Sequence, residues 1–391
     1  MHILVDNGAY TMRNMGDVAM LQACVSRIRL VVPAAQITVF CTNPELLGRY
    51  CQDVRALPVS SRDATYEPGR ITASNLVEKW LALKRTLAKT PAEAHQFQQA
   101  FSSADAVVVA GGGFLNDLNP LQTRPVLRML LDAAKKGRRT ALFSQGLGPL
   151  ENPEFLSLLG QACRAGTMVA LRESRRGPGI LRAAGAGADC SAVTGDDAVE
   201  MAWSARPVQV GTGLGFSLRQ VDYAALQDTD FQAVTRALSQ LKAQTGAKLI
   251  PVPISFNASE NDPVIIGRVA GAEAAAEAAT LDSPAALISQ AAKCRVLVTG
   301  TYHAGVFALS QGVPAVCLYR SPYYRDKMQG LAAQFGDGCE LINLAEEDAA
   351  TRIFAAAERL WQTGEQLRDG LLARAEAQVR AADSFYRRAL G

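Results

Sequence analysis

Short apolar runs alternate along the chain with longer segments in which apolar residues recur every three or four positions. The runs are rich in Val, Ile and Leu, which is typical of parallel strands covered on both faces. The longer segments predict helices, as in the one that carries Val18, Leu21, Val25 and Ile28 on one side. The pattern therefore predicts an α/β fold with helices on both sides of mostly parallel sheets.

The expected strands fall into two series. The first is His2–Asp6, Gln36–Cys41, Ala106–Ala110, Thr140–Ser144, Met168–Arg172 and Ala192–Thr194; the second is Gly213–Leu218, Lys248–Pro253, Val296–Thr299, Pro314–Leu318 and Glu340–Ile342. Between them, the segment WSARPVQVGTGLGFSL breaks the pattern with Pro and Gly near residue 205. We expect two doubly wound Rossmann-like domains, residues 1–205 and 206–391. A final helical segment, Leu360–Leu390, is expected to cross back and pack on the first domain.

Composition excludes several classes of protein. The 391 residues are 49% hydrophobic and 20% charged, and the net charge of +3 demands no nucleic-acid partner. No apolar run reaches the roughly 18 residues that suggest a membrane span. The eight cysteines form no Cys-x-x-Cys pair and no cluster with histidine. They predict a reducing, cytoplasmic location, and we expect no metal and no cofactor.

One segment bears on membrane contact. Residues 75–89, NLVEKWLALKRTLAK, predict a basic amphipathic helix. Such a helix either packs on its own sheet or makes peripheral contact with an anionic membrane at its inner face. Both interpretations stay open at the level of sequence.

The loops that follow strands are where chemistry is expected, because ligands of open α/β sheets bind beyond the carboxyl ends of the strands. After the first strand, Asn14 is a helix cap or a ligand group, Gly16 relaxes the backbone, and Asp17 is a candidate general base. Further on, Gly111, Gly112 and Gly113 bring backbone amides close to a ligand or form a packing turn. They are followed by Asn116 and Asp117, and Gln145 and Gly146 repeat the arrangement of a strand followed by glycine.

Basic and aromatic residues follow other strands. Arg172 and Arg219 stand at strand ends, where a guanidinium can hold a carboxylate or phosphate with two hydrogen bonds. Arg175 and Arg176 are interpreted as a solvated turn. The stretch TYHAGVFALSQGVPAV places Thr301, Tyr302 and His303 where a strand passes into a helix, and Tyr324 and Lys327 lie near another helix start. Because such a helix start points backbone amides outward, His303 is interpreted as a functional histidine rather than a core one.

Together these segments resemble the polysaccharide pyruvyl transferase family. The likeness lies in the order of NMGDVAM, GGGFLND, SQGLGP, LRES, TGDDAV, GFSLR, GVFALSQGVPAV and YYRDK, which spans most of the chain. The resemblance implies a GT-B-like fold with two Rossmann-type domains facing across a cleft. It also implies transfer of pyruvate from phosphoenolpyruvate to two hydroxyls of a sugar in polysaccharide biosynthesis of the cell envelope, with release of phosphate.

The chain departs from the family at two places. Thr301-Tyr302-His303 stands where the family usually has Arg-Leu-His, so His303 carries over and the donor-binding arginine does not. A threonine donates a hydrogen bond but supplies no charge, and the loss of one charge-assisted hydrogen bond costs on the order of 1.5–3 kcal/mol unless another cation replaces it. The family's Arg-Asp pair is here Arg172-Glu173.

The resemblance gives each candidate residue a role. Arg172 and Arg219 form the anion site, with His303 as acid or phosphate ligand and Asp17 as base toward the acceptor, or with these last two roles exchanged. Thr301, Tyr302, Tyr324 and Lys327 belong to the donor side; Asn14, Gly16, Gly111–Gly113, Asn116, Asp117, Gln145 and Gly146 belong to the acceptor side. The acceptor is a sugar, a glycan or a lipid-linked saccharide. Two alternatives stay open, a GT-B glycosyltransferase with a nucleotide-sugar donor and a binding protein of the same fold without catalysis.

Overall fold

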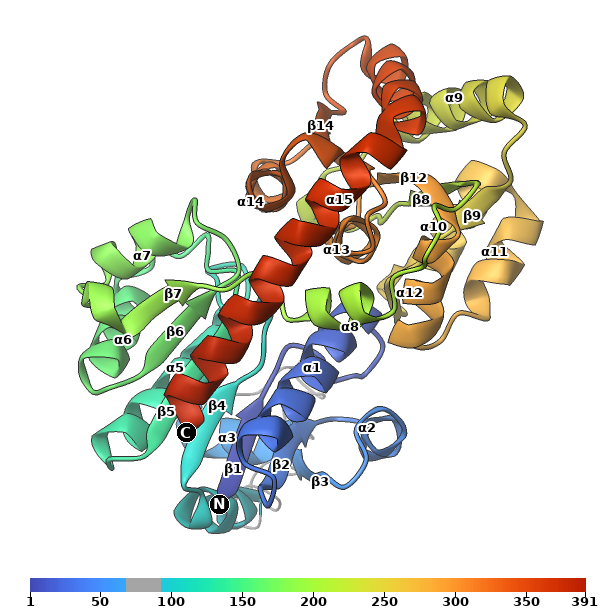
Figure 1. Cartoon of the computed structure of the whole chain (residues 1–391). Coiled ribbons are helices and arrows are strands. Elements are labelled where there is room, and N and C mark those ends of the chain that lie inside the picture. Colours follow the sequence, from blue (N-terminus) through green and yellow to red (C-terminus); the bar gives the residue numbers. More distant parts are fainter. Residues whose placement is uncertain (68–92) are drawn as a thin grey trace, which may run out of the picture.

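The computed structural model of the chain describes residues 1–67 and 93–391 (Figure 1). The amphipathic segment 75–89 lies outside the described residues. Two parallel sheets organise the rest, which confirms the predicted α/β fold class. The seven-stranded sheet has the order β3-β2-β1-β4-β5-β6-β7 and the five-stranded sheet the order β14-β13-β12-β8-β9.

The strands of the first sheet are β1 (His2–Asp6), β2 (Gln36–Cys41), β3 (Arg55–Pro58), β4 (Ala106–Val109), β5 (Arg139–Gln145), β6 (Met168–Leu171) and β7 (Ser191–Val193). Those of the second are β8 (Gly213–Ser217), β9 (Leu249–Pro251), β12 (Cys294–Thr299), β13 (Ala315–Tyr319) and β14 (Cys339–Asn343). A small antiparallel hairpin, β10 (Phe256–Asn257) and β11 (Glu260–Asn261), follows β9.

Strand order fixes where ligands can bind. In the first sheet the order changes direction between β1 and β4, and in the second between β8 and β12. The loops that leave such neighbouring strands run to opposite faces of the sheet, which opens a crevice at the carboxyl ends. The loops after β1, β4, β8 and β12 are therefore the ones that the topology brings to a binding site.

Helices cover both faces of each sheet. They are α1 (Met15–Val31), α2 (Pro44–Tyr50), α3 (Val59–Tyr66), α5 (Pro120–Lys135), α6 (Pro153–Arg164), α7 (Gly177–Ala183) and α8 (Ala198–Ser204), then α9 (Asp228–Thr245), α10 (Asp262–Ala270), α11 (Ala272–Ala279), α12 (Pro284–Ala292), α13 (Tyr302–Ser310), α14 (Pro322–Phe335) and α15 (Ala349–Leu390). The side chain of Asn14 caps α1, since its Oδ1 accepts hydrogen bonds from the amides of Gly16 and Asp17 at 3.1 and 3.4 Å.

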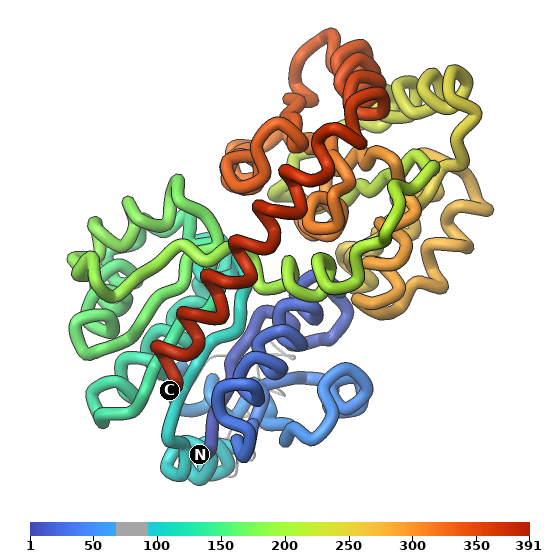
Figure 2. Tube along the Cα trace, in the orientation of Figure 1, coloured from blue at the N-terminus to red at the C-terminus, as the bar shows by residue number. Residues whose placement is uncertain are grey.

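The long helix α15 joins the two halves of the molecule (Figures 1 and 2). Its start is buried in the core of the second sheet through Ile353 and Leu360. Its end is buried against the first sheet, where the ring of Tyr386 stacks on that of Phe143 at 3.7 Å between centroids. The helix begins eleven residues before the predicted Leu360, at Ala349. A single element thus contributes to the cores of both sheets.

Candidate functional site

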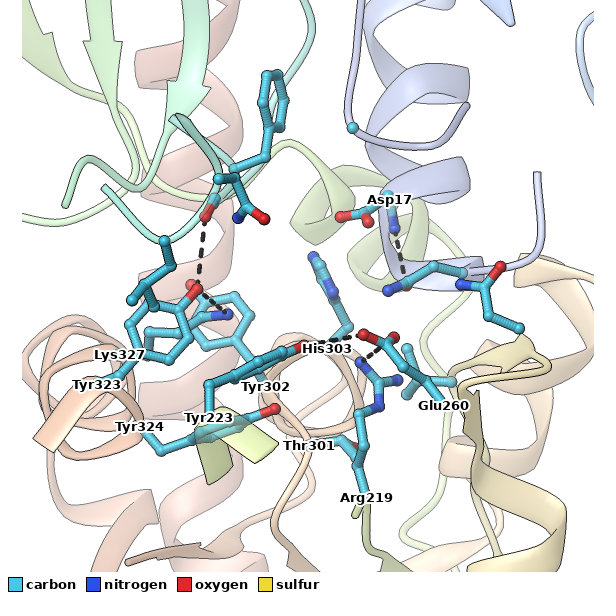
Figure 3. A pocket seen from close by; sticks show the side chains of 18 of the residues that line it. Asp17, Arg219, Tyr223, Glu260, Thr301, Tyr302, His303, Tyr323, Tyr324 and Lys327 are labelled. Atoms are coloured by element: carbon cyan, nitrogen blue, oxygen red, sulfur yellow. Dashed lines mark hydrogen bonds and ion pairs between the residues drawn. The ribbon is translucent and has the colours of Figure 1, made fainter. Parts of the chain in front are cut away.

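A cavity of about 290 Å³ lies where the loops of the two sheets meet (Figure 3). It is lined from the first sheet by Gly8, Thr11, Asn14, Asp17, Gly113, Phe114, Leu118, Asn119 and Arg172. From the second sheet it is lined by Arg219, Tyr223, Ile254, Asn257, Glu260, Thr301, Tyr302, His303, Tyr323, Tyr324 and Lys327. All the predicted donor-side residues are on this surface, as are Asn14, Asp17 and Gly113 from the predicted acceptor side.

The other predicted residues lie behind the cavity wall. Gln145 and Asn116 are fully buried: Gln145 donates to the carbonyls of Ala110 and Phe143, and Asn116 donates to that of Gly113. Their hydrogen bonds hold the loops after β4 and β5 and offer nothing to a ligand.

Asp117 is also used by the backbone, since its carboxylate accepts from the amides of Glu151 and Asn152. Gly146 lines a smaller neighbouring cavity and packs against Arg172, where a Cβ atom would lie 2.3 Å from Nη2. The acceptor-side prediction for these residues is therefore corrected to a supporting role in the loops.

The remaining glycines serve close packing. A Cβ atom on Gly111 would lie 2.1 Å from Cε of Met20, and one on Gly112 would lie 2.6 Å from the ring of Phe114. Neither residue lines the cavity. The three glycines after β4 therefore act mainly as a packing turn, and only Gly113 is at the cavity surface.

His303 stands in the first turn of α13 and points into the cavity (Figure 3). Its side chain is largely buried, with Nε2 at 3.7 Å from Oδ2 of Asp196 and 3.4 Å from Sδ of Met20. Gly16 packs against the other side of the ring. The imidazole is therefore fixed between α1 and a buried carboxylate, with one edge open to the cavity.

Asp196 connects His303 to Arg172. Its Oδ2 lies 3.6 Å from Nη1 of Arg172 as well as 3.7 Å from the histidine, and both Oδ2 and this Nη1 are buried without a hydrogen-bond partner among the described residues. Burial alone would raise the pKa of Asp196, but the neighbouring His303, the charge of Arg172 and the hydrogen bond from the amide of Ala198 outweigh it and hold that pKa below its usual value. Asp196 is thus a carboxylate that stabilises positive charge on either neighbour.

Arg172 and Lys327 form the cationic wall of the cavity. The guanidinium of Arg172 lies 4.2 Å from the ring centroid of Tyr302, and Nζ of Lys327 lies 4.9 Å from that of Tyr323. Lys327 also donates a long hydrogen bond of 3.4 Å to the Tyr323 hydroxyl. Within the described residues, Lys327 has no carboxylate within ion-pair distance. These two cations are therefore available to bind an anionic ligand.

Arg219 differs from this pair. Its Nε and Nη2 donate to the two carboxylate oxygens of Asp262, each at 3.0 Å, and Nη1 lies 3.7 Å from Glu260. Asp262 is fully buried and also accepts from the amides of Ile254 and Ser255. The prediction that Arg219 belongs to the anion site is therefore corrected, because its charge is already compensated by Asp262 and Glu260 and it braces the hairpin β10–β11.

Two further predicted residues have clear surroundings. Asp17 is half-buried at the cavity edge. Burial raises the pKa of its carboxyl group, although the charges of His303 and Lys327 act in the opposite direction.

Thr301 is buried, and its Oγ1 lies 2.7 Å from Oγ of Ser217 and 3.2 Å from Oγ1 of Thr299. The threonine hydroxyl is thus engaged within the protein, so it does not stand in for the missing arginine.

Several residues of the site were not predicted. Asp196 contacts His303 and Arg172 from behind the cavity wall; it lies in TGDDAV, three residues after β7, and a carboxylate after a strand was a signal that could have identified it. Asn257 and Glu260 belong to the hairpin, and Tyr223 to a short 3₁₀ turn at Asp222–Ala224, none of which has a periodic signature. The hairpin reaches the first sheet, where the amides of Met15 and Phe256 bond the carbonyls of Ile254 and Arg13 at 2.8 Å.

Among residues 1–67 and 93–391, no group of His, Cys, Asp and Glu side chains is arranged to hold a metal ion. In the same ranges, no helix combines the length and apolar character needed to cross a membrane.

Comparison with known proteins gives a family and a fold. The family model described as polysaccharide pyruvyl transferase matches residues 14–322. No curated protein sequence matches the chain. The UDP-GlcNAc 2-epimerase from Neisseria meningitidis, solved bound to UDP-GlcNAc, superposes with a TM-score of 0.59 at 11% identity, covering 100% of this chain and 99% of that one.

Two other solved structures are similar in the same way. A putative UDP-N-acetylglucosamine 2-epimerase from Listeria monocytogenes has a TM-score of 0.57 at 13% identity, with 99% and 94% of the two chains covered. A glycosyltransferase from Rickettsia africae has a TM-score of 0.54 at 11% identity, with 100% and 98% covered. At these identities the likeness concerns the fold, which is the GT-B arrangement of glycosyltransferases and related epimerases.

Proposed function

Because the chain belongs to the polysaccharide pyruvyl transferase family, we propose that it transfers pyruvate from phosphoenolpyruvate to two hydroxyls of a sugar or glycan as a cyclic ketal. The observation that carries the proposal is the cationic wall formed by Arg172 and Lys327. The guanidinium of Arg172 lines the cavity with its Nη1 facing Asp196 at 3.6 Å, and the ammonium of Lys327 has no carboxylate partner among the described residues. A donor with carboxylate and phosphate groups can bind to both cations.

The proposed reaction needs one acid and one base. A proton is added to the methylene carbon of the enol, which becomes the methyl group of the ketal, and the first acceptor hydroxyl adds to the neighbouring carbon and loses its proton. The bond from that carbon to the phosphate oxygen then breaks, and the second hydroxyl adds there. Two hydroxyl protons are lost; one balances the proton gained by carbon and the other leaves with the phosphate.

His303 is the proposed acid and Asp17 the proposed base. The imidazole of His303 is held at the cavity with its Nε2 3.7 Å from Oδ2 of Asp196, and an imidazole is a common donor in general acid catalysis. The raised pKa of Asp17 favours proton transfer, because a stronger base accepts a hydroxyl proton more readily. Arg172 would hold the donor, while Arg219 would act through the hairpin that it braces.

A nucleotide-sugar donor is the second candidate, supported by the epimerase fold neighbour solved with UDP-GlcNAc. The size of the cavity favours the smaller donor. Pockets for drug-sized ligands span roughly 300–1,000 Å³, and the present cavity of about 290 Å³ is at the lower limit. Phosphoenolpyruvate has one phosphate and a three-carbon skeleton, and it leaves room in such a volume for part of an acceptor.

The two donors are distinguished by binding. Thermal-shift and calorimetric titrations with phosphoenolpyruvate, UDP, UDP-GlcNAc and inorganic phosphate should show binding of phosphoenolpyruvate that weakens in Lys327→Met. Acceptor-dependent release of phosphate would then test turnover. Binding of the uridine compounds, with none of phosphoenolpyruvate, would refute the proposed function.

Location and acceptor also belong to the proposal. All eight cysteines are free, which suits a reducing cytoplasm. A lipid-linked acceptor at the inner face of the membrane is compatible with the basic character of segment 75–89. Fractionation of cells that express the protein, with and without this segment's lysines, would test membrane contact.

A further inference from the structure

Two consecutive carboxylates follow β7, and they have separate sets of partners. Asp196 and Asp197 are both buried, with 4% and 1% of their surface exposed. Asp196 contacts Arg172 and His303 behind the cavity wall, whereas Asp197 neither lines the cavity nor contacts those two residues. Burying a charge costs free energy unless partners compensate it. The partners of Asp197 therefore indicate what this second carboxylate does.

Two helices that are far apart in the sequence bind the two oxygens of Asp197. Its Oδ1 accepts a hydrogen bond of 3.1 Å from Nη1 of Arg27 on α1, and its Oδ2 accepts one of 2.8 Å from the Tyr386 hydroxyl on α15. Arg27 is fixed in turn, because its Nε donates to Glu200 at 2.5 Å and lies 3.5 Å from Asp383. Even with these partners, burial raises the pKa of Asp197 to about 6. Asp197 thus joins α1, α8 and α15 at one buried point.

The backbone on both sides of Asp196 is held as well. The hydroxyl of Ser144 donates to the carbonyl of the residue before Asp196 and accepts from the amide of the residue after it, each at 2.9 Å. Ser144 follows Phe143, whose ring stacks on that of Tyr386. Tyr386 therefore reaches the segment around Asp196 by two routes, through the carboxylate of Asp197 and through the end of β5.

We propose that Tyr386 and Arg27 are positioning residues of the site. They hold the carboxylate of Asp197, and the backbone that Asp197 anchors places the carboxylate of Asp196 beside the imidazole of His303. The last turns of α15 would then align a residue of the first sheet's loops with a residue of α13. The effect on turnover rests on the proposed function, whereas the position of the imidazole is measured without any substrate.

The imidazole of His303 reports on this alignment directly. The chain has three histidines, so spectra of ¹⁵N-labelled histidine rings in the full chain are simple, and His303→Gln identifies the signals of His303. Tyr386→Phe removes the hydroxyl that Asp197 accepts from but keeps the ring that stacks on Phe143. This variant should shift the ring signals of His303 and lower kcat by about tenfold, because small displacements of a catalytic group cost much of the rate.

A second variant and a matched control accompany this test. Arg27→Lys keeps the positive charge but loses the forked donor that serves Asp197 and Glu200 together, so it should shift the His303 signals in the same way. Tyr66→Phe is the control, since the Tyr66 hydroxyl donates to a carboxylate of α5 at 3.0 Å, away from the segment around Asp196. It should leave the His303 signals and kcat unchanged.

The outcomes separate this inference from the proposed function. Unchanged His303 signals and kcat in Tyr386→Phe, or equal changes in Tyr66→Phe, would overturn the positioning role. A lower melting temperature as the only change would mean that Asp197 serves stability alone. Shifted signals in a protein that fails to bind phosphoenolpyruvate would uphold the positioning role and remove the donor assignment. Melting curves show that each variant is folded, and Arg27→Lys gives the same comparison where Tyr386→Phe is not.

Discussion

Gly16 and His303 are packed so closely that a Cβ atom on the glycine would lie 2.0 Å from Nδ1 of the imidazole. The imidazole can occupy this position only because residue 16 of α1 is a glycine without a side chain. Gly16→Ala should displace the ring and lower kcat strongly. In a helix without this contact, alanine would be more stable than glycine by up to about 1 kcal/mol. Any loss of stability in Gly16→Ala would therefore come from the contact with His303 and not from the helix backbone.

A double-mutant comparison isolates this contact. Gly16→Ala should lower the melting temperature in the wild-type background and have little effect in the His303→Gly background, where the clashing ring and its Cβ atom, 2.6 Å from the added methyl group, are both gone. Gly48→Ala is the control, because a Cβ atom on Gly48 in α2 would have no neighbour within 4 Å. Equal destabilisation in both backgrounds would mean that the contact with His303 is not the cause.

His303→Ala should abolish turnover with a small change in melting temperature. General acid catalysis typically raises the reaction rate 10²–10⁴-fold. In His303→Gln, the glutamine side chain can donate a hydrogen bond but cannot titrate, so this variant should recover donor binding without recovering the rate. The exposed His95 provides a control substitution. Loss of about 1–3 kcal/mol of unfolding free energy with unchanged activity would instead identify His303 as a structural histidine.

Substitutions of the cationic residues that line the cavity should have two different effects, one on donor binding and one on stability. Arg172→Ala and Lys327→Met should weaken donor binding by roughly tenfold or more, the loss of one charge-assisted hydrogen bond. Arg219→Ala should mainly destabilise the fold, by about 3–5 kcal/mol, because it leaves the buried Asp262 unpaired. Calorimetry of donor binding and urea unfolding measure the two effects.

The neighbouring Arg175 and Arg325 are exposed and serve as controls for these changes. Equal effects of Arg172→Ala and Arg175→Ala on donor binding would remove the support for the cationic wall.

Asp196→Asn should change the stability of the protein and its dependence on pH. The pKa of Asp196 is held below its usual value in the folded state, so its contribution to stability is present above the unfolded pKa of about 3.9 and is lost as the pH falls through the lower folded value. The variant should therefore be less stable than the wild type at pH 7, and this difference should shrink in strong acid.

The same substitution should lower kcat and weaken donor binding. Asparagine keeps the shape of the side chain but removes the negative charge that lies 3.7 Å from Nε2 of His303 and 3.6 Å from Nη1 of Arg172, so both side chains lose the group that orients them. Wild-type turnover and donor affinity in the variant would show that Asp196 positions neither residue.

Asp17→Asn tests the base. Burial raises the pKa of Asp17, so the acidic limb of the kcat/KM profile should lie above the ordinary carboxyl value of about 3.9, with activity lost as the pH falls through it. The asparagine variant should lose most of the rate at every pH. An unchanged acidic limb in the variant would assign that limb to another group.

The sequence predicted the parts of the molecule that repeat a regular pattern. The strands next to the switch points, β1, β4, β8 and β12, are apolar runs with clear ends, so the loops after them could be placed at the cavity. β3 was missed because RALP has one buried residue, at Leu57, and ends in proline. An edge strand of that kind carries almost no apolar signal.

The site itself was predicted where residues follow strands and missed where they do not. Asp17, Arg172 and His303, which were proposed because they follow strands, all line the cavity. Glu260 and Tyr223 come from a hairpin and a turn whose place is set by tertiary contacts, which include the pairing of Ser255 with Asn14. The pairing of Arg219 with Asp262 was equally hidden, because the sequence does not show that the two residues lie side by side.

The shared helix α15 has a consequence for how the protein is made. Ile3 and Val5 of the first strand are buried together with Phe385, Tyr386 and Leu390. A ribosome synthesises the chain from the first strand onward, so α1 can cover this face early through Val18, Leu21 and Ile28, whereas the part of the cover near residue 385 emerges much later. Domains generally fold as units during synthesis. We therefore expect the core of the first sheet to be completed only when the end of α15 has left the ribosome.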